Sequence, residues 1–200
     1  MPHAFDPDEG FGSGPADGGT ADSREANLLG ALSLAVADRL ETATRAAAAH
    51  GGSAPAALTA LETFLEGSSI DTMRKPLGLT HSAAVRLVDR LAGAGLVRRA
   101  AGEDGRSVAV FLTPAGRRAA AQVQDGRMRG LADVLAPLTA AERESLTRLH
   151  EKLLAGLTSG RADAGRICRL CDADACGHEQ GRCPVTRAAD RAEASKTRAS

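Results

Sequence analysis

Leucine and valine recur at helical spacing over most of this chain, and they alternate at strand spacing in one short stretch. One apolar stripe runs through residues 24–50, and a second begins near Ser53 and ends at Gly67. Two more follow a Thr-Pro start at Thr113 and a capping box at Thr139. The stripes consist of Leu29, Leu32, Val36 and Leu40; Leu58, Leu61 and Leu65; Met128, Leu131 and Leu135; and Leu146, Leu149, Leu153 and Leu157. The pattern predicts a mainly α-helical protein.

A short helix, a turn and a longer helix are predicted between the second and third stripes. The first covers Ser69 to Lys75, and we expect it to end there because Pro76 would lose a hydrogen bond and clash with the preceding turn. The second runs from about Thr80 to Ala94. Its core face at helical spacing consists of Ala84, Val88 and Leu91. The face left free for other contacts carries Ser82, Arg86 and Arg90.

A two-stranded hairpin follows these helices. Its predicted strands are Leu96–Ala100 and Ser107–Leu112, with Gly102–Arg106 as the tip. The alternate residues expected to face the core are Val108, Val110 and Leu112. Helix, turn, helix and hairpin in this order describe a winged helix-turn-helix, which places one helix in the major groove of DNA. The predicted fold class is therefore mainly α, with an α+β winged helix-turn-helix flanked by N- and C-terminal helices.

The charge of the chain is balanced overall but not locally. The formal net charge is +0, whereas residues 74–106 contain seven basic side chains against three acidic ones. A basic patch of this kind attracts nucleic acid, because the phosphates are negatively charged. Aromatic residues are only 2% of the chain, with no Trp or Tyr, which argues against stacking on single-stranded bases. The composition therefore favours double-stranded DNA as the partner of this protein.

The block from Leu77 to Arg118 resembles the MarR (multiple antibiotic resistance regulator) family of DNA-binding proteins. The resemblance extends over residues 25–158, and its most specific part is the recognition helix with its hairpin, or wing. It implies a homodimer that binds a pseudo-palindromic operator in double-stranded DNA. It also implies a small-molecule effector, bound between the dimerisation helices and the DNA-binding unit.

The resemblance assigns the DNA contacts as well. They are Thr80, Ser82, Val85, Arg86 and Arg90 on the recognition helix and Asp104 and Arg106 at the tip of the wing. Arg86 can fork onto guanine O6 and N7, while Val85 can meet a thymine methyl group. Asp104-Gly105-Arg106 matches the Asp-x-Arg pattern of the family, in which the arginine enters the minor groove and the aspartate braces it.

All four cysteines of the chain lie in one short segment. Cys168, Cys171, Cys176 and Cys183 have the spacing C-x2-C-x4-C-x6-C, and Pro184 follows the last. Four thiolates with a C-x2-C knuckle suit one tetrahedral Zn²⁺, which is the cofactor we expect. An iron–sulfur cluster is the alternative, since compact cysteine runs that end before proline also bind clusters. Metal-free thiols prone to disulfide formation are the third interpretation, and His178 is a further candidate near the site.

The chain divides into three parts on this basis. Residues 1–23 are predicted to be a disordered tail. Residues 24–159 form the MarR-like domain, and residues 160–200 comprise a linker, the four-cysteine segment and a tail without helical periodicity. Within the domain, the DNA-binding unit covers about 53–113, and the dimerisation helices cover about 24–50 and 114–159.

Other classes of function stay open on the sequence. No apolar run approaches the roughly 20 residues of a membrane span, and no secretory signal is visible, so we expect a cytoplasmic protein without a membrane partner. We expect no enzyme activity. One alternative is a thiol or metal-dependent redox protein that uses Cys168-x-x-Cys171, although such motifs usually lie near a βαβ unit. Another is a metal-stabilised protein-interaction module.

Overall fold

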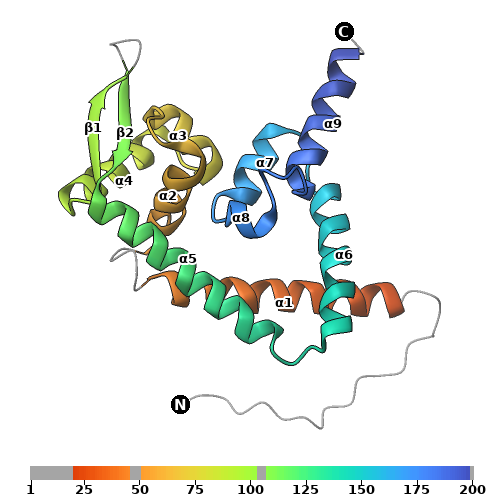
Figure 1. Ribbon diagram of the computed structural model, residues 1–200. Coiled ribbons are helices and arrows are strands. Elements are labelled where there is room, and N and C mark those ends of the chain that lie inside the picture. The colour runs from red at the N-terminus through yellow and green to blue at the C-terminus, as the bar shows by residue number, and fades with distance from the viewer. Residues whose placement is uncertain (1–19, 46–50, 103–106, 199–200) are drawn as a thin grey trace, which may run out of the picture. The chain divides into compact units, whose positions relative to one another are not determined.

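The computed structural model describes residues 20–45, 51–102 and 107–198 (Figure 1). The helices are α1 (Thr20–Arg45), α2 (Ala54–Ala60), the π-helix η1 (Leu61–Leu65), α3 (Ile70–Leu77), α4 (His81–Gly93), α5 (Pro114–Leu135), α6 (Ala140–Gly156), α7 (Arg161–Cys168), α8 (Ala173–Cys176) and α9 (Pro184–Arg198). The strands are β1 (Val97–Ala101) and β2 (Val108–Leu112). The chain separates at Val36 into two compact units, and the second contains every element after α1. The predicted fold class, a largely helical chain with one small hairpin, is confirmed.

The predicted helix starts of the central domain are confirmed by their capping bonds. Thr80 Oγ1 accepts from the amide of Ala83 at 3.2 Å and starts α4. Thr113 caps α5 in the same way. At α6, Thr139 and Glu142 form the reciprocal capping box, with Thr139 N donating to Glu142 Oε2 at 2.8 Å. These caps use side chains three residues apart, which is why the sequence alone located them.

Helix α1 differs from the prediction at its start. It begins at Thr20, inside the segment that the composition predicted to be disordered. Residues 1–19 and 46–50 lie outside the described residues, so the rest of that tail and the end predicted for this helix at Gly51 are not tested. The large apolar side chains of the N-terminal unit are exposed: Leu28, Leu29, Leu32 and Leu34.

A continuous apolar core joins α2, α3, α4, the hairpin and the first half of α5. Its largest fully buried side chains are Leu58, Leu61, Met73, Leu87, Leu91, Val88, Val110 and Val123. Strands β1 and β2 pair antiparallel from Val97 opposite Leu112 to Ala101 opposite Val108. In Figure 1 the hairpin and α2–α4 lie together at one end of α5. The recognition helix is thus held on a rigid core.

Two details of this domain correct the sequence analysis. Val108 was expected to face the core but is 44% exposed, because it pairs with Ala101 at the outer end of the hairpin, beyond the core. Ala109 is buried instead, where it forms a β-bridge with Ser69. Helix α3 does not end before Pro76 but includes it and ends at Leu77, since a left-handed Gly78 closes the helix one residue later.

Close backbone approaches fix α5 against its neighbours at two glycines. A Cβ atom at Gly116 would lie 1.9 Å from the carbonyl oxygen of Leu96, next to β1. A Cβ atom at Gly126 would lie 2.6 Å from the carbonyl oxygen of Ala43, in the C-terminal part of α1. No side chain fits at either distance, so glycine is required at both positions.

The segment beyond Gly160 is helical, contrary to the predicted linker and irregular tail. Helices α7, α8 and α9 form what we call the C-terminal module, residues 160–198. Arg161 joins its two ends by ion pairs to Asp190 and to Glu193, the latter at 3.2 Å. Helix α7 contacts α9 and α3, and α9 contacts α6. The module therefore packs onto the DNA-binding unit as well as onto the long helices.

Helix α6 buries none of its residues in this single chain. Its exposed apolar side chains are Leu149, Leu153 and Leu157, at 57%, 50% and 68% exposure. These are three of the four residues of the predicted seam, and they leave an apolar face on the surface. Among the described helices, none combines the length and the apolar character that crossing a membrane requires.

Candidate functional site

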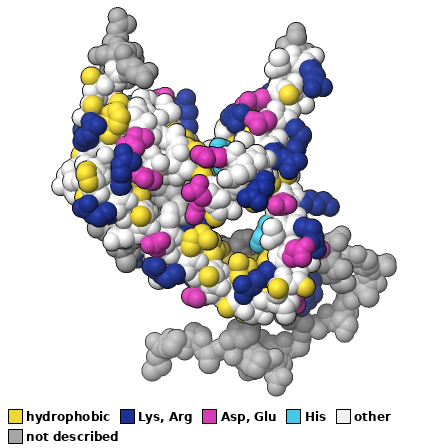
Figure 2. All heavy atoms as spheres, viewed as in Figure 1, with side chains coloured by type: hydrophobic (Ala, Val, Ile, Leu, Met, Phe, Trp, Pro, Cys, Tyr) yellow, Lys and Arg dark blue, Asp and Glu magenta, His cyan; other side chains and the backbone are white. Residues whose placement is uncertain are grey.

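Helix α4 presents two chemically different faces. Ala84, Leu87, Val88 and Leu91 are buried in the core. Ser82, Arg86 and Arg90 are exposed on the other side, as the spacing predicted. In the described part of the chain, neither arginine side chain forms an ion pair or a hydrogen bond. Both guanidinium groups are therefore free to contact an anionic ligand, and Figure 2 shows Lys and Arg side chains on the side that carries the hairpin and α4.

The other residues assigned to DNA contact have more varied surroundings. Thr80 is exposed, and its hydroxyl is used as the helix cap and lies 3.3 Å from Ser82 Oγ. Val85 is half-buried, so only part of its side chain is accessible. Asp104 and Arg106, at the tip of the wing, lie outside the described residues. The structure thus brings together Thr80, Ser82, Arg86 and Arg90 at α4, and their assignment to DNA contact, like that of the wing tip, stays a prediction.

Two arginines of β1 brace the hairpin, and the sequence analysis did not single them out. Arg99 Nη2 donates to Asp89 Oδ1 on α4 at 2.6 Å. Arg98 lies over the ring of Phe111 on β2, with 4.4 Å between Cζ and the ring centroid. The ion pair compensates the acidic residue on the exposed side of α4 and ties the wing to the recognition helix. The sequence signal for this ion pair was Asp89, an acidic residue among the arginines of residues 74–106.

Helix α3 carries a second charged contact, which reaches the first residue of α4. Arg74 Nε donates to Asp71 Oδ1 at 2.6 Å, and His81 Nδ1 lies 4.0 Å from the same oxygen. The hydrogen bond from Arg74 lowers the pKa of the Asp71 carboxyl below its usual value. All three side chains are close to the start of the recognition helix, and the carboxylate orients the two basic groups there.

The four cysteines occupy the ends of helices in the C-terminal module. Cys168 ends α7 and Cys176 ends α8, while Cys183 precedes Pro184 at the start of α9. Cys171 follows Cys168 in a tight turn in which its amide donates to the Cys168 carbonyl at 2.9 Å. Cys183 is only 2% exposed, and the other three are half-buried. Cys183 therefore belongs to the small buried core at the start of α9.

The thiols interact in sequence order. Cys168 donates a hydrogen bond to Cys171, which lowers the pKa of Cys171 to about 6 and raises that of Cys168. Burial raises the pKa of Cys176 to about 12, and its hydrogen bond to Cys183 acts in the same direction. Burial of Cys183 opposes ionisation, but hydrogen bonds from the Thr186 hydroxyl and amide hold its pKa below the usual value. The cluster therefore alternates donors and acceptors.

The four thiols do not surround a common centre in this structure. Among the described residues, no three or more Cys, His, Asp or Glu side chains already have the geometry of a metal site. His178 is engaged elsewhere, since its Nδ1 lies 3.1 Å from Thr186 Oγ1 and its ring contacts that of Phe64 at 5.3 Å between centroids. The four sulfurs are thus the ligand set that the module offers.

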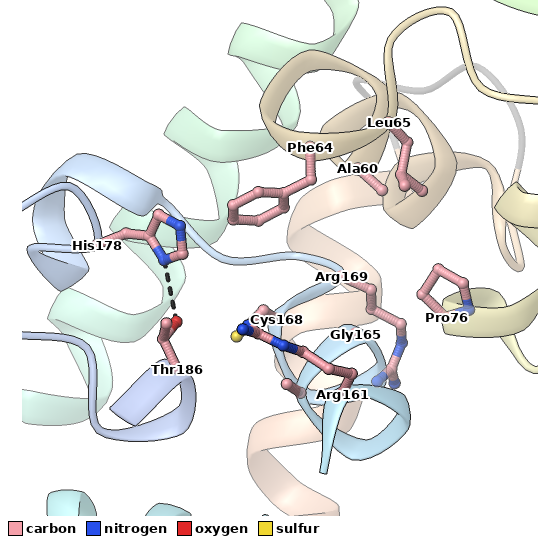
Figure 3. A pocket seen from close by; sticks show the side chains of 11 residues that line it. Ala60, Phe64, Leu65, Pro76, Arg161, Gly165, Cys168, Arg169, His178 and Thr186 are labelled. Carbon is pink, nitrogen blue, oxygen red and sulfur yellow. Dashed lines mark hydrogen bonds between the residues drawn. The ribbon is translucent and has the colours of Figure 1, made fainter. Parts of the chain in front are cut away.

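A cavity of about 210 Å³ lies between the C-terminal module and the DNA-binding unit. Figure 3 shows the His178 ring beside Phe64 of η1, with Cys168, Arg161 and Arg169 on the module side and Pro76 of α3 on the other. The wall is mostly apolar. Because residues of η1, α3 and α7 share this cavity, it marks where the module and the helix-turn-helix meet.

A larger cavity, of about 450 Å³, lies where the C-terminal part of α1 approaches the start of α2. Leu40, Thr44 and Pro55 contribute to its wall, and Leu77 of α3 and Leu170 of the module close it. It is situated between a long helix and the DNA-binding unit, which is where the sequence analysis expected an effector.

Proteins similar to this chain are found among solved structures. No family profile matches the sequence, and no curated protein matches it. A MarR family protein from Bacillus stearothermophilus is 24% identical, with 69% of this chain and 96% of that one covered and a TM-score of 0.59. A MarR family transcriptional regulator from Silicibacter pomeroyi is 27% identical over 63% and 87% of the chains, with a TM-score of 0.50. The RV1404 protein of Mycobacterium tuberculosis is 25% identical over 68% and 92%, with a TM-score of 0.53.

The matches cover nearly the full length of these proteins but only about two thirds of this chain. The chain has the winged-helix fold of MarR-type proteins, as the recognition helix and wing indicated. The remaining third leaves room for additions to that fold. The C-terminal module, with all four cysteines, lies outside residues 25–158, over which the family resemblance extends.

Proposed function

We propose that this MarR-type winged-helix chain is a transcriptional regulator that binds a pseudo-palindromic operator in double-stranded DNA as a homodimer. The observation that carries the proposal is the exposed face of α4, where Ser82, Arg86 and Arg90 have no competing ion pairs among the described residues. A helix with a buried apolar face and free arginines opposite is the element that reads the major groove. The Silicibacter pomeroyi structure, described as a transcriptional regulator, supports the assignment.

In the proposed complex each exposed residue has a distinct role. Arg86 donates both guanidinium branches to a guanine edge, and Arg90 reaches the same groove or its phosphates. Ser82, near the helix start, contacts a phosphate or base edge. Asp104 and Arg106 extend the contact to the adjacent minor groove, whose narrow A·T-rich form concentrates negative potential. The Arg99–Asp89 ion pair keeps the wing in register with the recognition helix.

Dimerisation is supported by the apolar face of α6. Leu149, Leu153 and Leu157 together expose a stripe that a second copy of the chain can cover. Exposed stripes of this kind are typical of subunit interfaces rather than of free surface. A two-fold dimer presents two recognition helices, which matches an operator with two half-sites about one DNA turn apart.

We also propose that a small-molecule effector binds the 450 Å³ cavity between α1 and the start of α2. Its volume falls within the usual range of small-molecule sites, which is about 300–1,000 Å³. The wall combines apolar side chains with the charged pair Glu41 and Arg45, which lie 2.5 Å apart. A ligand there would bias the angle between the long helices and the DNA-binding unit, and hence operator affinity.

The test is selection of genomic DNA fragments by the full-length protein, followed by gel shift on the enriched sequence. We expect a palindromic site bound by two chains, with affinity that falls as salt rises because phosphate contacts release counterions. Arg86→Ala should lose the selected site. Enrichment of no sequence, or equal binding to random duplex, would refute sequence-specific regulation.

A further inference from the structure

The C-terminal module has too little apolar core to hold its shape alone. Its buried side chains are Cys183, Val185, Ala188 and Ala189, all near the start of α9. Three of these are small, and α7 and α8 bury none of their residues. Units below about 40 residues usually need disulfides, metals or a partner to fold stably. All four cysteines are free thiols here, so no covalent link serves that purpose.

The backbone of the module instead brings the four thiols together. A tight turn links Cys168 to Cys171, and Gly177, with φ +68°, reverses the chain directly after Cys176. The carbonyl of Cys183 accepts from Arg187 N in the first turn of α9, which orients this end of the cluster. These turns place the end of α7, the end of α8 and the start of α9 so that the four cysteines lie near one another.

We propose that Cys168, Cys171, Cys176 and Cys183 bind one Zn²⁺ ion, and that this ion holds the C-terminal module against α3, η1 and α5. Binding forms four Zn–S bonds and releases the remaining thiol protons to water, with no change in oxidation state. The thiol side chains turn toward a common centre while the backbone turns stay in place. His178 contributes no ligand, because its ring is held by Thr186 and Phe64.

The tight turn from Cys168 to Cys171 favours a single ion over a cluster, because a C-x2-C knuckle points two sulfurs at one Zn²⁺. One tetrahedral Zn²⁺ has its sulfurs at about 2.3 Å, which keeps the four ligands in mutual contact. An iron–sulfur cluster binds its thiolates on separate irons and so spreads them apart.

The proposed ion would be coupled to the DNA-binding unit through three contacts. Gln124 Nε2 on α5 donates to the carbonyls of Leu170 and Cys171, at 3.3 and 3.0 Å. Leu170, between two ligands, packs against the apolar core of the DNA-binding unit. At Gly165 an added Cβ would lie only 3.4 Å from Pro76 Cβ, so α7 runs directly against the end of α3.

Metal loss would therefore release α3 and α5, which flank the recognition helix. The effect on DNA rests on the proposed function, whereas zinc binding and the packing of α3 do not. A coupling of this kind typically changes affinity by about 5- to 150-fold. We infer that the zinc-free protein binds its operator more weakly by a factor in that range.

The first experiment is elemental analysis of the full-length protein purified without oxygen. We expect one zinc per chain and no colour, loss of the zinc in Cys176→Ser, and retention of it in His178→Ala as the matched control. A brown protein with iron and sulfide would overturn the zinc assignment, and so would a protein with neither metal. Loss of zinc in His178→Ala would show that the ligand set is wrong.

The second experiment measures hydrogen exchange in the wild-type chain before chelation, after it and after zinc is returned, which avoids any folding defect of a variant. We expect faster exchange in α3 and α7 without zinc, reversed by the metal, and a parallel fall in operator affinity. Unchanged exchange in α3 would overturn the coupling even if zinc is bound. Reversible exchange in a protein that selects no DNA sequence would support the zinc coupling and refute the regulator.

Discussion

Replacing Arg86 by alanine gives the most direct test of the exposed face of α4. Arg86 projects into solvent and has no ion pair among the described residues, so its removal should leave the fold intact. Exposed substitutions of this kind usually change the free energy of unfolding by less than about 0.5 kcal/mol. Alanine also has a higher helix propensity than arginine, so the helix itself is not weakened. Any loss of operator binding then reports the contact with DNA.

The magnitude follows from the type of contact. A bidentate arginine–guanine pair discriminates by about 1–3 kcal/mol, which corresponds to about 5- to 150-fold weaker operator binding. If Arg86 contacts a phosphate instead, its removal would weaken binding to operator and random DNA alike. It would also reduce the salt dependence of binding by about one counterion. The two readings of Arg86 therefore predict different patterns across DNA sequence and salt.

The assay is fluorescence anisotropy on the selected operator and on random duplex, each at several salt concentrations. Arg148→Ala is the matched control, because Arg148 is an exposed helical arginine on α6 whose only ion pair among the described residues is with Glu144. We expect the control to bind as the wild type does, and Arg86→Ala to lose affinity for the operator alone. Equal operator affinity of the two variants, with both folded, would refute the placement of α4 in the major groove.

Three further changes test other parts of the proposal. Arg106→Ala, at the tip of the wing, should weaken operator binding by about 1–3 kcal/mol and relax the preference for A·T-rich flanks, as titration of flank variants would show. The pair Leu149→Asp and Leu153→Asp should convert the dimer to folded monomers in sedimentation, since both side chains are at least half exposed on α6; an unchanged dimer would place the interface elsewhere. Thr139→Ala should lower the free energy of unfolding by about 1 kcal/mol by removing a helix cap. Hydrogen bonds from the Thr139 amide and hydroxyl lower the pKa of Glu142, so the stabilisation that its carboxylate contributes is present above pH 4.5 and is lost as the pH falls through the lowered pKa. A Thr139→Ala effect equally large well below that pKa would contradict the bond from the Thr139 hydroxyl to Glu142.

The sequence by itself determined the winged-helix domain because its signals are local. Helix α4 was located by the Thr80 cap and a repeat of apolar residues over about two turns, and both are present in the structure. The capping box at Thr139 was equally explicit. Such signals involve residues three or four positions apart, so they can be read without knowing what packs against the helix.

Val108 and Pro76 show where local reading fails. Alternation placed Val108 toward the core, but a core has a finite extent, and the outer end of β2 lies beyond it. Pro76 was expected to stop α3 early, yet the helix closes just after it, where the amides of Gly78 and Leu79 donate to the carbonyls of the last turn and Gly78 is left-handed.

The C-terminal module was decided by tertiary structure alone. Its helices α7 and α8, Arg161–Cys168 and Ala173–Cys176, are too short to show a period or to be stable in isolation. The sequence identified the four cysteines and the ligand chemistry they offer. It did not reveal that the segment folds against α3 and α5, because those contacts join residues far apart in the chain, such as Gln124 with the carbonyl of Cys171. Packing supplies the stability that these short helices lack, and only the folded chain shows it.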